Sequence, residues 1–81
     1  MTEIKDMLKE IFLTVFPELD ESSFNWENSQ TEYENWDSFA HLRIVTEIEK
    51  KFDVKLDIDD VIYINSAKGF LELITKIKSA S

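Results

Sequence analysis

Residues 35–54 read Asn-Trp-Asp-Ser-Phe-Ala-His-Leu-Arg-Ile-Val-Thr-Glu-Ile-Glu-Lys-Lys-Phe-Asp-Val and carry the clearest helical signal in the chain. Apolar side chains recur there at spacings of three and four, the pattern of a helix with one buried face. They are Phe39, Leu42, Val45, Ile48 and Phe52, and Ile44 widens the stripe. Asp37 is a favoured N-cap residue, so we expect the helix to begin there and to end near residues 51–53.

The sequence before this segment predicts one helix and then a long loop. Residues 2–16 have apolar side chains at helical spacing: Ile4, Met7, Leu8, Ile11, Phe12 and Val15. Pro17 ends this helix, because the residue before a proline avoids helical geometry. Residues 17–36 show no sustained period and are rich in Ser and Asn, which indicates a loop. Its apolar side chains should pin it to the core: Leu19, Phe24, Trp26, Tyr33 and Trp36.

The sequence after residue 53 predicts a short helix and a last longer one. Residues 54–58 alternate like a strand but have no partner strand, so we expect an extended link. Residues 59–64 read as a short helix, and Asn65 or Ser66 caps the last one. The last helix should turn Ala67, Phe70, Leu71, Ile74 and Ile77 inward, and residues 78–81 should fray.

These elements add up to an all-α fold: a small four-helix bundle with three longer helices, one short helix and a long first loop. The 81 residues are too few for two packed cores, so residues 1–81 are expected to form one domain. The predicted core of the later helices comprises Leu42, Val45, Ile48, Phe52, Leu56, Ile58, Val61, Ile62, Phe70 and Ile74.

Composition excludes several classes of function. The chain has no Cys and one His, which removes disulfides, thiolate metal sites, cysteine nucleophiles and most histidine metal sites. A net charge of −8 argues against a nucleic-acid or anionic-membrane surface, which needs clustered Lys and Arg. No apolar run reaches about 18 residues, and the charged first residues do not resemble a signal peptide. We therefore expect a cytoplasmic monomer that meets basic protein surfaces.

Smaller signals have bland interpretations. Four acids, Asp53, Asp57, Asp59 and Asp60, lack the Gly and bidentate Glu of a calcium loop, so no metal site is predicted. His41 is expected to lie on the helix surface, with no residue near it in sequence that would orient it as a base. The tryptophans are expected to anchor the loop.

The stretch Asn35–Leu42 and the helix after it, together with Asp59-Asp60-Val61-Ile62, residues 66–74 and the long first loop, resemble the acyl carrier protein family. The resemblance covers nearly the whole chain. It implies a carrier without catalysis of its own, whose Ser38 is esterified by a phosphopantetheinyl transferase (holo-acyl-carrier-protein synthase). That enzyme would move 4′-phosphopantetheine from coenzyme A with Mg²⁺. Asp37, Phe39 and Trp36 would flank the attached group.

The residues themselves agree with what the resemblance implies. A phosphodiester anion on Ser38 would lie at a helix N-terminus, where free N–H groups and the helix dipole favour negative charge. Because the chain has no thiol, thioester chemistry requires an imported one. The arm would then carry acyl intermediates as thioesters for fatty-acid, polyketide or lipid-type biosynthesis.

Departures from the family pattern predict a specialised carrier. Fatty-acid carriers usually have Leu after the serine and Gly shortly before it, where this chain has Phe39 and Asn35-Trp36. Arg43 and Lys50 stand where the family commonly has acids. The candidate docking residues for an acyl ligase, ketosynthase or acyltransferase are Arg43, Glu47, Glu49 and Asp53.

The family also shelters its acyl chain between the second and third helices. By that resemblance, the residues that would line an acyl pocket are Val45, Phe52, Ile58, Val61 and Ile62. Two alternatives stay open. The cargo could be an aminoacyl group, as in peptidyl and D-alanyl carriers, or the chain could be an acidic helical interaction module with no cofactor.

Overall fold

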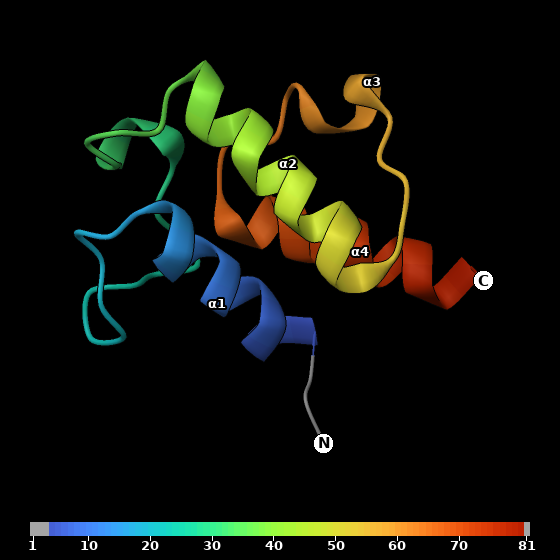
Figure 1. Ribbon diagram of the computed structural model, residues 1–81, viewed down its shortest axis with the longest axis horizontal. Helices are drawn as coiled ribbons and strands as arrows, with labels where there is room; N and C mark the ends of the chain where they lie inside the picture. Colours follow the sequence, from blue (N-terminus) through green and yellow to red (C-terminus); the bar gives the residue numbers. More distant parts are fainter. Residues whose placement is uncertain (1–3, 81) are drawn as a thin grey trace.

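The fold is known from a computed structural model that describes residues 4–80 (Figure 1). Its elements are α1 (Ile4–Val15), the 3₁₀ helix η1 (Gln30–Glu32), α2 (Ser38–Phe52), α3 (Ile58–Val61) and α4 (Ala67–Ala80). No β-strand forms within these residues; one isolated bridge joins Ser29 to Ser66. The predicted all-α bundle of three longer helices and one short helix is confirmed. No helix in the described range is long and apolar enough to cross a membrane.

Helix α1 packs against both α2 and α4. Its buried face follows the predicted stripe, with Leu8, Ile11, Phe12 and Val15 in the core. The helix ends one residue earlier than predicted, because Pro17 lies two residues beyond Val15. Residues 2 and 3, also predicted to be helical, lie outside the described residues.

The long connection between α1 and α2 is pinned by aromatic rings, as predicted. The Phe12 ring lies at the centre of the cluster, with ring centroids 6.0 Å from Phe24, 6.3 Å from Tyr33 and 5.5 Å from Trp36. Such contacts stabilise a loop that has little regular hydrogen bonding of its own. The short helix η1 within this loop was not predicted; its capping box pairs Glu32 with the N–H of Ser29.

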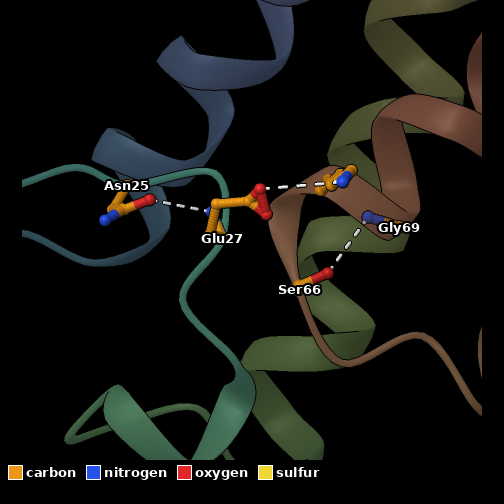
Figure 2. Close-up of polar contacts among 5 residues, drawn as sticks. Asn25, Glu27, Ser66 and Gly69 are labelled. Atoms are coloured by element: carbon orange, nitrogen blue, oxygen red, sulfur yellow. Dashed lines mark hydrogen bonds and ion pairs between the residues drawn. The ribbon is translucent and has the colours of Figure 1, made fainter.

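Backbone contacts tie the same loop to the start of α4. Gln30 N donates to Asn65 O over 2.6 Å, and Lys68 N donates to Trp26 O over 3.2 Å. The Glu27 carboxylate lies 3.6 Å from Lys68 Nζ (Figure 2). The loop and α4 therefore hold each other although they are far apart in sequence.

Helix α4 (Ala67–Ala80) begins after one of the two predicted cap residues but ends later than predicted. Ser66 is the residue that caps it, since its Oγ accepts from Gly69 N over 3.1 Å (Figure 2). The predicted fraying of residues 78–80 is wrong: the helix continues to Ala80, and Lys78 Nζ donates to Phe52 O over 2.9 Å. Ser81 lies outside the described residues.

Helix α2 has the predicted N-terminus. Asp37 is the N-cap, and its Oδ1 accepts from Ala40 N over 2.9 Å. The helix ends at Phe52, and Asp53 adopts the left-handed conformation with φ 53°. This conformation allows the Asp53 N–H to bond back to Glu49 O and close the helix.

Helix α3 is shorter and earlier than predicted. The expected range was 59–64, but the helix is the single turn Ile58–Val61, followed by a turn at residues 62–63. Residues 54–57 form the predicted extended link.

Three residues predicted for the core are exposed. Leu42 is 60% exposed, Ile58 71% and Ile62 59%, and Phe39 at the start of the predicted stripe is 82% exposed. The buried residues of α2 are Ile48 and Phe52, as predicted, together with Ile44. The reason is geometric: one turn of α3 is too short to cover the apolar side of α2 that α1 does not reach. This uncovered side is where the site lies.

Candidate functional site

A groove of about 500 Å³ runs between α2 and α3. Its lining is mostly apolar and includes the three exposed residues that were predicted for the core. The apolar lining residues are Leu42, Val45, Leu56, Ile58, Val61 and Ile62, and the polar ones are Gln30, Ser38, His41, Thr46 and Glu49. In Figure 1 the start of α2 and the turn of α3 lie toward the same side of the molecule.

Ser38 is the first residue of α2 and lines this groove. Its side chain is exposed, and no hydrogen bond to its hydroxyl is found among residues 4–80. The neighbouring Asp37 carboxylate caps the helix through Ala40 N. Phe39 projects into solvent on the other side of Ser38. Ser38 therefore presents a free nucleophilic oxygen at the edge of an apolar groove.

Apart from Ser38, the polar side chains that line the groove already have partners. Gln30 Nε2 donates to Trp36 O over 2.9 Å, and Thr46 Oγ1 donates to Leu42 O over 2.9 Å. Glu49 Oε2 accepts from Leu56 N over 2.8 Å. These bonds leave the apolar side chains as the main surface that a ligand in the groove would meet.

His41 is half-buried and held at both ring nitrogens, so its prediction as an unoriented surface residue is wrong. Nδ1 lies 3.1 Å from Trp36 Nε1, and Nε2 lies 2.8 Å from Val61 O. The ring also stacks on Trp36, with ring centroids 6.0 Å apart, and contacts Phe70. Trp36 is five residues away in sequence, but Val61 is twenty away, and no local pattern indicated that contact. With both nitrogens engaged, the ring has no lone pair left for Ser38.

The structure brings four of the five predicted pocket residues together. Val45, Ile58, Val61 and Ile62 line the groove, whereas Phe52 is buried in the core and does not. Trp36, predicted to flank the attached group, is 5% exposed and does not line the groove either; it contacts the lining residues His41, through its indole, and Gln30, through its carbonyl oxygen. Gln30, Leu56 and Thr46 were not named for the site.

The candidate docking residues divide into two kinds. Arg43 and Asp53 are exposed on α2 and at its end, and Glu47 is half-buried. Glu49 instead points toward the groove and accepts the Leu56 N–H, which gives it a structural part. The acids of this helix are thus not all available for a partner.

Two residues of the long loop between α1 and α2 have shifted pKa values. Hydrogen bonds from the Ser22 hydroxyl and from Ser23 lower the pKa of Asp20 in the long loop. Burial, and to a smaller degree the charge of Glu32, raise the pKa of Tyr33 above 10.0. Within residues 4–80, no group of three or more His, Asp or Glu side chains is placed to hold a metal ion.

A scan against models of protein families finds no match for the chain, and neither a search of curated proteins nor a search of solved structures finds a similar one. What the protein does must therefore be inferred from its own residues and their geometry. Three features are available for that inference: the unengaged hydroxyl of Ser38, its position at the start of α2 and the apolar groove beside it.

Proposed function

We propose that the chain is an acyl carrier protein that bears 4′-phosphopantetheine on Ser38. The observation that carries the proposal is the position of Ser38, exposed at the first residue of α2 and on the edge of an apolar groove. The resemblance of residues 35–54 to this family supports the same residue independently of the groove.

The surroundings of Ser38 fit a phosphodiester. The first N–H groups of α2 have no acceptor within the helix, and the helix dipole favours an anion at this end. Asp37 takes the N–H of Ala40 and so fixes the start of α2 without covering Ser38. Because the serine side chain is exposed, a transferase can reach its oxygen.

The attachment step needs only the serine hydroxyl from this chain. Ser38 Oγ would attack the phosphorus that bears pantetheine in coenzyme A. A new P–O bond forms, the pyrophosphate P–O bond breaks, and adenosine 3′,5′-bisphosphate leaves. The hydroxyl proton passes to a base of the transferase, since both nitrogens of His41 are engaged. The attached arm supplies a thiol that holds acyl groups as thioesters, and tethering raises their concentration at a partner's active site.

The groove favours an apolar acyl cargo over an aminoacyl one. Most of its lining is apolar, and a cationic ammonium group would lose hydration against those side chains. The length of the acyl chain should therefore determine how many of the groove residues it contacts. NMR shifts of Val61 and Ile62 are expected to change with the length of the attached acyl chain, and invariant shifts would place the cargo in solvent.

The charge of α2 supports a specialised partner. Arg43 is exposed, and none of the described residues forms an ion pair with it. A partner surface built for a uniformly acidic helix would meet this cation unfavourably. A dedicated acyl ligase, ketosynthase or acyltransferase that tolerates Arg43 fits this chain better than housekeeping fatty-acid synthesis.

Intact-mass measurement tests the proposal. Purified protein is incubated with coenzyme A, Mg²⁺ and a promiscuous phosphopantetheinyl transferase. The wild type should gain the mass of one arm, and Ser38→Ala should gain none. Ala is tolerated at the first helical position, and Asp37 still caps the helix, so the variant should fold.

Ser79→Ala is the matched control, since it removes an exposed serine from the last turns of α4. It should be modified like the wild type. An unmodified wild type, or a modified Ser38→Ala, would reject the proposal. The chain would then be an acidic interaction module, for which the exposed Phe39 and Tyr63 would be the first contact candidates.

A further inference from the structure

His41 joins three parts of the chain at one ring. Trp36 Nε1 approaches its Nδ1 from the loop at 3.1 Å, and its Nε2 reaches the carbonyl oxygen of Val61 in α3 at 2.8 Å. The ring itself belongs to α2 and lines the groove beside Ser38. We call this arrangement of Trp36, His41 and Val61 the His41 bridge.

The two partners fix the proton on the His41 ring. An indole N–H can only donate, so Nδ1 must accept from Trp36 and carry no proton. A carbonyl oxygen can only accept, so Nε2 must donate to Val61 and carries the ring's proton. The bridge therefore requires a neutral imidazole with its proton on Nε2, and no purely apolar side chain can replace it.

Helix α3 has little else to hold it against α2. It is one turn long, and of its four residues only Val61 is buried. Its other hydrogen bonds are local, such as Ile62 N to Ile58 O at 2.9 Å. Within the part of the chain that the structure describes, the bond from His41 to Val61 O is the hydrogen bond that joins α3 to another helix. Segments with so few contacts open most easily.

We propose that His41 is a positioning residue: its bridge from Trp36 to Val61 holds α3 in place as the movable wall of the groove. Breaking the bridge frees α3 while the aromatic core around Phe12 stays closed. The importance of this wall for a cargo rests on the proposed carrier function, but the bridge belongs to the bare chain and is tested there.

Hydrogen exchange on the unmodified protein tests the bridge. The amides of Ile62 and Ile64 report on α3, because they donate to Ile58 O and Val61 O. In His41→Leu they should exchange about tenfold faster than in the wild type, while amides of α1 and α4 keep their rates. His41→Gln retains one donor and one acceptor and should restore slow exchange.

The indole bond is tested separately. Trp36→Phe removes the donor but keeps a ring in the core, so it should shift the ring ¹⁵N signals of His41. Trp26→Phe is the matched control: it changes a loop tryptophan that does not contact His41, and it should leave those signals in place.

Three results would overturn the bridge. They are unchanged exchange at α3 in His41→Leu, equally fast exchange in His41→Gln, and faster exchange spread evenly over α1 and α4. If His41→Leu does not fold, the exchange rates of the Ile62 and Ile64 amides are compared between Trp36→Phe and Trp26→Phe. The bridge requires faster exchange in Trp36→Phe, and equal rates would overturn it. Failure of Ser38 modification would leave these results unaffected, so the two proposals fail separately.

Discussion

The aromatic side of the molecule and the groove side are built in opposite ways. Around Phe12, the rings of Phe16, Phe24, Tyr33, Trp36 and Phe70 lie with centroids 5.5–6.3 Å away. Around the groove, Leu42, Ile58 and Ile62 remain more than half exposed. The aromatic packing that stabilises the fold thus lies on one side. The other side keeps apolar surface open next to Ser38, where a ligand or a partner can cover it.

The largest difference in stability is expected between a variant of a core aromatic residue and a variant of a groove residue. Phe12→Ala should lower the free energy of unfolding by about 3–5 kcal/mol, because it leaves a cavity in the aromatic cluster. Ile62→Ala, at an exposed position, should change it by less than about 0.5 kcal/mol. Urea denaturation measures both. A large loss from Ile62→Ala would mean that the groove side also stabilises the fold.

The start of α2 is the point where the two sides meet. Asp37→Ala should lower the free energy of unfolding by about 1 kcal/mol, since it removes the acceptor for Ala40 N. Asp37→Asn keeps an acceptor oxygen and serves as the control. If both variants lost the same stability, the charge of Asp37 and not its cap would matter.

A stabilising change is expected at Tyr33 on the aromatic side. Its hydroxyl is buried and has no hydrogen-bond partner among the described residues. Tyr33→Phe should raise the free energy of unfolding by about 1 kcal/mol, because it removes that uncompensated group. Tyr63→Phe, at an 87% exposed position, is the matched control and should be neutral.

The same residue gives the aromatic side a pH dependence. The pKa of Tyr33 is raised above 10.0 in the folded protein by burial, so the unfolded chain loses this proton first. Ionisation of this group therefore leaves the free energy of unfolding unchanged below pH 10.0 and lowers it as the pH rises above that value. Urea denaturation at a series of pH values above 10.0 should show that the free energy of unfolding falls less steeply with pH in Tyr33→Phe than in the wild type. The same dependence on pH in both proteins would refute this prediction.

The smallest effect on stability is expected on the exposed face of α2. Arg43→Glu places like charges four residues apart, beside Glu47, and should cost about 0.2–0.5 kcal/mol. The arm-bearing variant should nevertheless react faster than the wild type with a housekeeping ketosynthase, because it restores an acidic helix. Arg43→Gln, which removes the cation without adding an acid, should fall between them. No change of rate would argue against Arg43 as a specificity residue.

Local signals were enough to predict most of the helices. The Asp37 cap, the spacing of apolar residues and Pro17 placed the C-terminal end of α1 and both ends of α2 within a residue or two of where they are observed. The aromatic loop residues indicated correctly that the loop packs on the core. These signals are local or depend only on residue type, which is why the sequence reveals them.

The groove and the bridge depend on contacts that periodicity does not contain. Leu42 has the spacing of a core residue, but the single turn of α3 is too short to cover it, and Ile58 and Ile62 at the two ends of that turn are exposed as well. The partner of His41 in α3 lies twenty residues away. Whether an apolar residue is buried depends on which segment packs opposite to it. The sequence between α2 and α3 does not indicate how these two helices lie relative to each other.

The most direct test of the central claim is the location of an adduct. Protein co-produced with a phosphopantetheinyl transferase is digested, and the fragment that contains Ser38 is sequenced by tandem mass spectrometry. We predict one arm on the Ser38 oxygen and none on any other serine. A bare polypeptide, or an arm on a different residue, would contradict the account.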